Sequence, residues 1–387
     1  MLEITTAIFL TLLGSAIYHL IPQAKVRLRM GWVAALSFFI ILAHHPIAAF
    51  AAGAAGIFAW TLYLLGRRNK TWKKYGPFSV IALLMVFSYE DILVATDPFS
   101  NTLVQFGMSF YILRLYLALR TAAARDQRVR LEEFFVIALF FPIFPAGPIC
   151  AQEAFSRSAA LDRPLLNNYL LGFMRIGMGI FALYFVPTMI ASLAIPIIQW
   201  SSALFVVDWA AMDGFSAYCA MLLLFLLLYA NFAGYTQIAI GLGLFFGFEI
   251  PENFRYPFLA TNIQNFWQRW HLSLSKFITT QIYLPLMLSL RKPRVSIFLA
   301  FALVGMWHQV NVQYLVWGVG HGSMLVAYMT FNGSPLHKSI VSRVNAKLWM
   351  LLSWLLTISM VSFLSVFANQ PGLPEALAFA QSLVSGW

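Results

Sequence analysis

The chain has 387 residues, of which 61% are hydrophobic and 10% are charged, and its mean hydropathy is +0.77. A soluble domain carries about 25% charged residues, so this composition excludes an ordinary water-soluble protein. Apolar segments of roughly 18 or more residues, the length that crosses about 30 Å of hydrocarbon, recur from end to end. The length alone suggests two or three domains, but no polar linker divides the sequence. We therefore predict one helical membrane domain over residues 1–387.

The net charge of +11 comes from 25 Lys and Arg against 14 Asp and Glu. These cations stand in short bursts between the apolar segments rather than along one face. That distribution is typical of cytoplasmic loops and argues against nucleic acid as a partner. Cys150 and Cys219 lie in strongly apolar sequence without metal-binding spacing, so we interpret them as packing residues.

The first predicted membrane helix spans residues 4–21. Glu3 precedes it, and the basic Lys25, Arg27 and Arg29 follow it. This order is the reverse of that in a signal peptide, where positive charge comes first. We expect the segment to remain in the membrane with the N-terminus outside.

Four further helices are predicted before residue 120. Residues 31–66 form a helical pair with a tight outer turn at His44, His45 and Pro46. The basic burst 67–74 then returns the chain to the cytoplasm. Two more helices, 77–90 and 102–119, are joined outside by an acidic stretch that includes Glu90, Asp91 and Asp97.

The segment 134–151 is rich in Pro and Gly. We predict a re-entrant element there, because irregular backbone is tolerated at membrane depth where protein buries it. The remaining predicted spans are 168–198, 215–248, 295–311, 313–331 and 348–369. These make about ten spans with both termini outside, and the cytoplasmic loops are those at Lys25, Arg67, Arg125, Arg291 and Lys338.

Residues 249–294 form the most polar stretch of the second half. On one continuous helix, Trp267, Trp270, His271 and Leu274 would share a face, since they lie three or four residues apart. This spacing predicts that His271 lies beside indole rings rather than facing water.

His308 lies deep in the next apolar segment. It follows Arg294 by about 14 residues, so at ~1.5 Å per residue it would lie roughly 20 Å into the bilayer. A titratable group at that depth is costly, and it predicts a functional role.

A histidine in a membrane bundle can also serve only as an interhelical hydrogen-bonding residue. We assign that role to His19, His44, His45 and His337, which lie near predicted membrane interfaces. His321 stays open between structure and function, because the glycines beside it allow close helix packing.

Four motifs follow one another in the second half. They are residues 251–258, 266–275, 305–308 and 317–322, which have the sequences PENFRYPF, FWQRWHLSLS, GMWH and WGVGHG. In order and spacing they resemble the core of the membrane-bound O-acyltransferase family, in particular its bacterial branch of alginate O-acetyltransferases and teichoic-acid D-alanyl transferases. The motif core covers about residues 229–331, and weaker similarities upstream extend the resemblance over most of the chain.

The resemblance implies an all-α polytopic fold, with re-entrant and amphipathic helices around a central tunnel. It also implies transfer of a small acyl group, of acetyl or D-alanyl type, from a thioester to a hydroxyl. His308 would be the general base, since neutral imidazole accepts a proton near pH 7. His271 would position the substrates or polarise the thioester carbonyl. Ser273 and Ser275 match the family motif, but as helix residues they are expected to bond to backbone rather than to carry an acyl group.

The same resemblance suggests which residues contact substrate. We expect Trp267, Trp270 and Trp307 to line the substrate path. Asn231 and Gln237 stand where the family commonly has acidic groups, and we expect their amides to contact substrate instead. Gln309 follows the Trp-His pair where the family often has Gly.

The resemblance further implies a cytoplasmic donor, either coenzyme A or carrier-protein phosphopantetheine. A basic inner surface suits an acidic carrier protein, and it suits anionic membrane lipids equally. The acceptor would be an extracytoplasmic glycan or envelope polymer, served by a periplasmic or extracellular partner at the bacterial plasma (inner) membrane. We expect no bound cofactor and no metal, because no cluster of His, Cys and carboxylates has metal spacing.

A proton-coupled transporter is the alternative, with His271 and His308 as relay sites. Two features argue against it. The sequence shows no half-length repeat, and acids inside the predicted spans are sparse.

Overall fold

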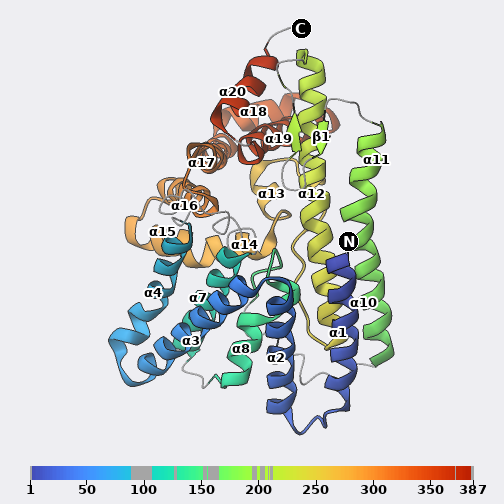
Figure 1. The fold of residues 1–387 in the computed structure, drawn as a ribbon. Coiled ribbons are helices and arrows are strands. Elements are labelled where there is room, and N and C mark those ends of the chain that lie inside the picture. The colour runs from blue at the N-terminus through green and yellow to red at the C-terminus, as the bar shows by residue number, and fades with distance from the viewer. Residues whose placement is uncertain are drawn as a thin grey trace. The chain divides into compact units, whose positions relative to one another are not determined.

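The computed structural model describes residues 2–88, 107–125, 129–150, 155, 165–193, 198–200, 205–207, 209, 212–370 and 372–384. Within these ranges the chain is almost entirely helical (Figure 1), as the composition predicts. The contacts divide it into a first unit, Met1–Ile180 with Gly234–Glu252, and a second unit, Phe181–Ala233 with Asn253–Trp387. The acids predicted outside at Glu90, Asp91 and Asp97 lie outside the described residues.

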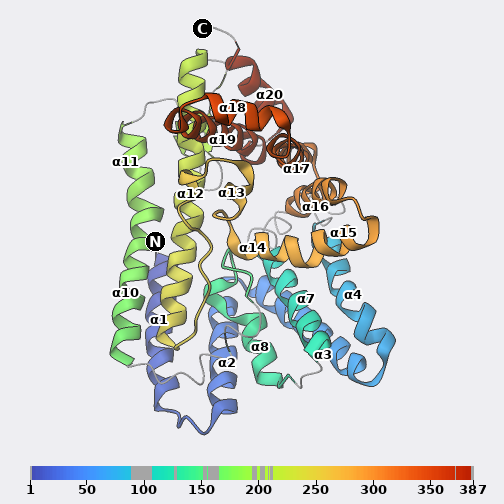
Figure 2. The same cartoon turned by 180° about the vertical axis from the view of Figure 1, so that it is seen from behind.

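The first unit consists of helices α1 (Leu2–Leu20), α2 (Val26–His44), α3 (Pro46–Arg68), α4 (Lys70–Ser88), α7 (Met108–Arg125), α8 (Leu131–Leu139), the 3-10 turn η1 (Phe141–Ile143), α10 (Leu165–Ile180) and the second part of α12 (Gly214–Phe245). Helices α3, α4 and α7 pack against one another, and they lie side by side in both views (Figures 1 and 2). Helix α2 ends at His44 and Pro46 begins α3, so the predicted tight turn is confirmed.

The second unit consists of the π-helical turn η3 (Phe181–Phe185), α11 (Val186–Leu193), strands β1 (Ile198–Trp200) and β2 (Phe205–Val207), the first part of α12, η5 (Pro257–Leu259), α13 (Ile263–Trp267), α14 (Leu272–Phe277), the π-helical turn η6 (Ile278–Tyr283), α15 (Leu284–Leu290), α16 (Pro293–His308), α17 (Val312–Asn332), α18 (Pro335–Arg343), α19 (Ala346–Asn369) and α20 (Leu373–Ser382). The strands pair antiparallel, with Gln199 opposite Val206. The prediction that the span from 168 continues to 198 is therefore wrong at its end, because α11 stops at Leu193 and Ile198 is in a strand.

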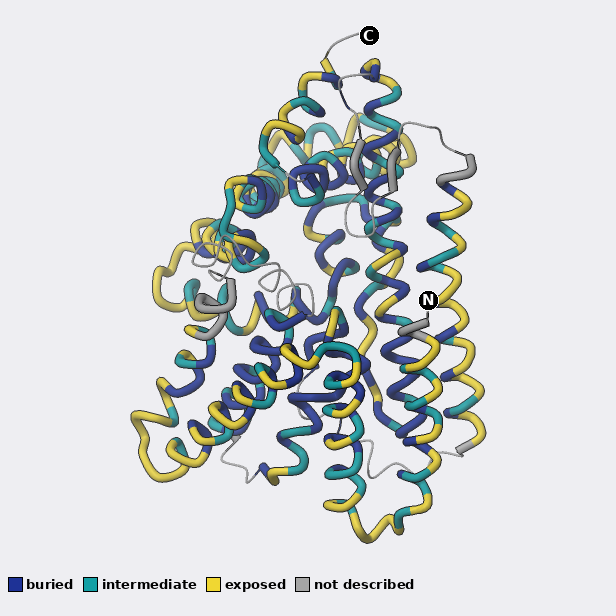
Figure 3. Tube along the Cα trace, viewed as in Figure 1, coloured by how far each residue is buried: buried dark blue, intermediate teal, exposed yellow. Residues whose placement is uncertain are grey.

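Five helical stretches are long and apolar enough to cross a membrane: α2, α3, residues 166–190, α12 and α19. Shorter apolar helices occur at residues 5–20 and in α16. Large apolar residues of α10 and α19 are exposed, and exposed residues recur along α10 in Figure 3, as expected of surfaces that face lipid rather than water. The chain is thus a multi-pass membrane protein, while the count of about ten spans stays a prediction.

Helices α10 and α12 approach closely in the first unit through glycines seven residues apart. A Cβ atom at Gly172 would lie 2.9 Å from the carbonyl oxygen of Gly241, and one at Gly179 would lie 2.6 Å from that of Gly234. Glycines allow this approach because they have no side chain between the two backbones. Lipid provides no hydrophobic driving force between helices, so this close packing is what stabilises the pair.

The segment predicted to be re-entrant begins with the short helix α8 and the turn η1 and continues as irregular backbone to Cys150. Ile143, Phe144, Ile149 and Cys150 are all buried. Protein therefore covers most of this irregular backbone, with Pro145 exposed, and such cover is the condition for irregular backbone at membrane depth. Whether it dips into the bilayer stays a prediction.

Arg114 of α7 is a buried cation in the first unit. It is 1% exposed, and its guanidinium carbon lies 5.9 Å from the ring centroids of both Tyr111 and Phe144. None of its three side-chain nitrogens has a hydrogen-bond partner among the described residues. Both rings therefore face this charge and offset part of it through cation–π contacts.

Candidate active site

The helical stretch that carries His271 is interrupted. Helix α13 ends at Trp267, and α14 begins at Leu272. His271 itself has φ 44°, in the left-handed region. The prediction that one continuous helix places Trp267, Trp270 and His271 on a common face is therefore wrong. It failed because a left-handed non-glycine residue is costly and no local sequence pattern indicates it.

Hydrogen bonds from a distant segment hold this interruption in place. The side-chain oxygen Oδ1 of Asn253 accepts from the backbone N–H of Ser273 (3.2 Å) and from its hydroxyl (2.8 Å). The carbonyl of Asn253 accepts from Leu272 N–H (2.8 Å), and Arg255 N–H donates to the carbonyl of Arg269 (2.8 Å). Residues 253–255 thus bracket the left-handed turn on both sides.

Aromatic rings surround His271. Its side chain is 3% exposed, and the ring of Phe232 meets it edge-on with 4.6 Å between centroids. The neighbouring Trp270 stacks on Phe225 (5.2 Å) and on Phe266 (5.4 Å). The prediction that His271 does not face water is confirmed. Its described ring contact is with the phenyl group of Phe232 rather than with an indole, and tertiary packing rather than a helix face produces it.

His308 is the last residue of α16. Its half-buried ring stacks on Tyr314 (5.6 Å) and meets Trp317 edge-on (5.3 Å). Trp307 lies beside it, with 4.5 Å between ring centroids. Asn311 begins α17 by accepting a hydrogen bond from Tyr314 N–H (2.9 Å), so the cap that starts α17 also fixes the ring under His308.

Two glycines allow α16 and α17 to pack closely beside this histidine. A Cβ atom at Gly305 would lie 2.3 Å from the carbonyl oxygen of Tyr314, and one at Gly318 would lie 2.5 Å from that of Phe301. The glycines of two separate motifs therefore meet. Their contact holds the Trp307–His308 end of α16 against α17.

Ring contacts connect the surroundings of His271 and His308 within the second unit, although 37 positions separate them in sequence. Trp317 contacts His308 (5.3 Å) and Trp267 (6.0 Å). Trp267 in turn contacts Phe266 (5.8 Å), which stacks on Trp270, the residue before His271. The structure thus brings together the two residues predicted to be catalytic. Two imidazoles in a largely buried, ring-lined environment can accept and donate a proton with little competition from water.

His321, which the sequence left open, belongs to the same cluster. It is 1% exposed, and its ring lies 4.8 Å from Trp317 and 5.2 Å from Trp267. Its Nδ1 has no hydrogen-bond partner among the described residues. Because Trp317 contacts both His308 and His321, the two histidines share one indole wall. The Trp-Gly-x-Gly-His spacing was the signal available, but it could not show which side of α17 faces α13.

The remaining predicted site residues are distributed differently. Trp267 and Trp270 are buried in the cluster, whereas Asn231 is exposed on α12 next to Phe232. Gln237 belongs to the first unit. Its side-chain oxygen accepts a hydrogen bond from Arg175 (2.7 Å), which also pairs with Glu252 (2.5 Å). The Gln237 amide therefore takes part in a polar network with those two residues.

No group of three His, Cys, Asp or Glu side chains is arranged to hold a metal ion within the described ranges. Independence from metal and from a bound cofactor stays a prediction.

Comparisons with known proteins extend these observations. The pattern of the family described as MBOAT, membrane-bound O-acyltransferase family, matches residues 20–367. A peptidoglycan O-acetyltransferase of Helicobacter pylori is 28% identical over 343 residues, 85% of this chain and 62% of that protein. A probable alginate O-acetylase of Pseudomonas fluorescens is 30% identical over 237 residues, 59% of this chain and 46% of that protein.

A teichoic acid D-alanyltransferase of Bacillus subtilis is 27% identical over 240 residues, 58% of this chain and 58% of that protein. The chain thus spans between 46% and 62% of the length of these three relatives. The three proteins are named for O-acetylation of peptidoglycan, O-acetylation of alginate and D-alanylation of teichoic acid.

Proposed function

The chain belongs to the membrane-bound O-acyltransferase family, and on this premise we propose that it transfers a small acyl group from a thioester to a hydroxyl, with His308 as general base. The observation that carries the proposal is that His271 and His308 both border one connected cluster of aromatic rings. Both histidines lie in motifs that resemble the family's core.

The proposed chemistry needs one base and close positioning. His308 removes the proton of the acceptor hydroxyl as its oxygen attacks the thioester carbonyl. The new C–O bond forms, the C–S bond breaks, and the imidazolium returns the proton to the leaving thiolate, so a free thiol is released. General-base catalysis contributes about 10²–10⁴-fold, and orientation of two substrates in a dry site contributes the rest.

His271 is proposed to act by position. It occupies a left-handed turn, and Asn253 holds the residues that follow this turn by hydrogen bonds. Packing therefore limits the rotamers that the His271 ring can adopt. A fixed imidazole can donate a hydrogen bond to the thioester carbonyl, where negative charge develops in the transition state. Trp267, Trp270 and Trp307 would line the path of the acyl group, with Asn231 of the same unit as a further substrate contact.

The family and the names of the relatives support a proposal for the donor and the acceptor. We propose a thioester on coenzyme A or on a carrier-protein phosphopantetheine at the cytoplasmic side of the plasma membrane. The acceptor is a hydroxyl of an extracytoplasmic glycan or envelope polymer, the class that the names peptidoglycan, alginate and teichoic acid share. A periplasmic or extracellular protein would complete delivery to the polymer, and both termini would lie outside.

The transporter alternative is not favoured. A relay would also place histidines in the membrane, but the family match and the relatives are all named for acyl or acetyl transfer.

Substitution of His308 tests the proposal. In the full chain, expressed with its native partners, His308→Ala and His308→Gln should lower acyl transfer by about 10²–10⁴-fold at normal protein level, as loss of a general base does. His271→Ala should lower it less completely, and His45→Ala, outside the cluster, should have little effect. Acyl groups on the envelope polymer and protein in the membrane are measured in parallel. A well-expressed His308→Ala variant with near-normal transfer would refute the assignment.

A further inference from the structure

A second site lies in the first unit, away from the histidines in sequence and chemistry. A cavity of about 480 Å³ opens where the end of α3, the start of α4 and the last turns of α7 meet. Gly66 and Gly76 line it, and a Cβ atom at Gly66 would lie 3.2 Å from the Cα atom of Lys73. The absence of a side chain at Gly66 therefore lets α3 and α4 converge at its mouth.

The mouth of this cavity is cationic. Arg67, Arg68, Lys70 and Lys73 all line it, and its described lining contains no Asp or Glu. Arg67, Arg68 and Lys70 are exposed. Four like charges around one opening repel one another, and an anion bound between them would offset this repulsion.

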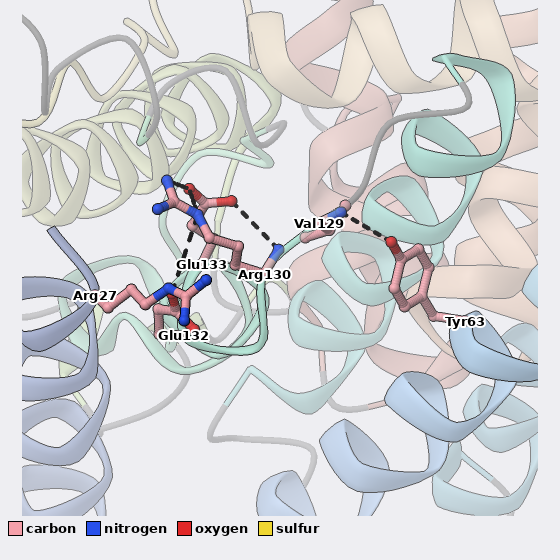
Figure 4. Close-up of polar contacts among 6 residues, drawn as sticks. All are labelled: Arg27, Tyr63, Val129, Arg130, Glu132 and Glu133. Carbon is pink, nitrogen blue, oxygen red and sulfur yellow. Dashed lines mark hydrogen bonds and ion pairs between the residues drawn. The ribbon is translucent and has the colours of Figure 1, made fainter. Parts of the chain in front are cut away.

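Two described acids of the same unit are already paired elsewhere. Glu132 lies 3.6 Å from Arg27, and Glu133 pairs with Arg130 (Figure 4). Among the described residues, no ion pair reaches Arg67, Arg68 or Lys70. Arg67, Arg68 and Lys70 are therefore available for an anion from outside the described chain.

The inner wall of the cavity is apolar. Leu62 of α3 and Leu119 and Ala122 of α7 are buried and line it. Trp72 lies at the opening and is 41% exposed, as is common for indoles at the membrane–water interface. A cationic mouth above an apolar wall, at the end of the membrane helix α3, suits a molecule with an anionic head and a hydrocarbon part.

We propose that this cavity binds the headgroup of an anionic phospholipid. The guanidinium groups of Arg67 and Arg68 match phosphate oxygens in a bidentate geometry, and Lys70 adds a point charge. The glycerol and first methylenes would lie on Leu62, Leu119 and Ala122. A soluble phosphate compound such as coenzyme A would share the cationic mouth but leave the apolar wall uncovered. Basic pockets between membrane helices are suited to such lipids, and the site does not depend on acyl transfer.

Lipid binding by the purified full chain tests the proposal. Protein in a neutral detergent is titrated with phosphatidylglycerol or phosphatidylcholine, and bound lipid is counted by native mass spectrometry. The wild type should bind phosphatidylglycerol at least tenfold more tightly. The triple variant Arg67→Gln/Arg68→Gln/Lys70→Gln should lose about a hundredfold, since each cation near an anionic lipid contributes roughly fivefold.

Two further variants separate a cavity from a general surface charge. Lys338→Gln/Arg343→Gln/Lys347→Gln removes the same charge from the second unit and should leave binding unchanged. Ala123→Phe keeps all the charge but narrows the cavity, so it should weaken binding. Equal losses in both triple variants, or an Ala123→Phe variant that binds like the wild type, would show surface attraction alone and overturn the proposal. Competition by coenzyme A at equal concentration would overturn it too, by assigning the phosphate site to the donor.

Discussion

Asn253 is predicted to stabilise both the fold of the second unit and the position of His271. It is fully buried, and its Oδ1 accepts two hydrogen bonds from Ser273. Asn253→Ala removes this acceptor while the backbone bond from Leu272 N–H to the carbonyl of residue 253 can persist. A buried donor that loses its acceptor costs about 1–3 kcal/mol. Both donors lose this acceptor, so, with partial relaxation, Asn253→Ala should lower the free energy of unfolding by about 2–4 kcal/mol.

Ser273→Ala provides the matched comparison. It removes one donor and leaves the Asn253 side chain with the backbone N–H of residue 273, so its cost should be only about 1 kcal/mol. In a double-mutant cycle the two substitutions should be non-additive, since each removes the same hydroxyl contact. Unfolding of the purified chain by SDS titration, followed by tryptophan fluorescence, measures all four free energies.

The effect on chemistry follows from the backbone. His271 with φ 44° occupies a conformation that costs a non-glycine residue about 1–3 kcal/mol, so loss of the Asn253 contacts should let the turn relax. Acyl transfer should then fall in Asn253→Ala even under conditions where the protein is folded. The reasoning is refuted if Asn253→Ala unfolds within about 0.5 kcal/mol of the wild type, the range typical of surface substitutions.

Three further predictions test other features. Gly172→Ala should destabilise the protein by about 1–3 kcal/mol, because the new Cβ atom meets a backbone oxygen of α12. Gly177→Ala is the control, since nothing lies within 4 Å of its Cβ position. It should be neutral or slightly stabilising in the same SDS titration. Purified protein should keep full activity in a metal chelator, and loss of activity that one added metal restores would contradict this. Single cysteines in the five predicted basic loops should react with a membrane-impermeant thiol reagent only after the membrane is opened, and labelling in intact cells would invalidate the predicted topology.

The sequence predicted well those elements whose physical cause lies in neighbouring residues of the chain. The turn at His44–Pro46 follows from proline's missing N–H, and the structure ends and restarts helices there. Likewise, the end of α16 at His308 coincides with a polar stretch whose Asn311 caps the next helix. In both places the local chain alone determines where a helix stops.

The elements that the sequence could not provide depend on distant partners. The left-handed turn at His271 requires Asn253, eighteen positions upstream. The polar network of Gln237 depends on Arg175 in another helix. His321 could be placed beside His308 only after α16 and α17 were known to pack through Gly305 and Gly318. Hydropathy and motif spacing do not reveal such contacts, because they show which segments are apolar but not which helix faces pack together.

Arg114 has a consequence for how the chain enters the membrane. Helix α7 has 18 residues, about 27 Å at 1.5 Å per residue, and it is not among the stretches apolar enough to span on their own. An arginine near the centre of an inserting segment opposes partition into lipid by roughly 2.5–3.5 kcal/mol. In the finished protein α7 packs against α3, α4 and α8. During synthesis α3 and α4 leave the ribosome first, so α7 would be retained at the translocon until it can enter together with them, with Arg114 passing from water to protein without crossing bare lipid.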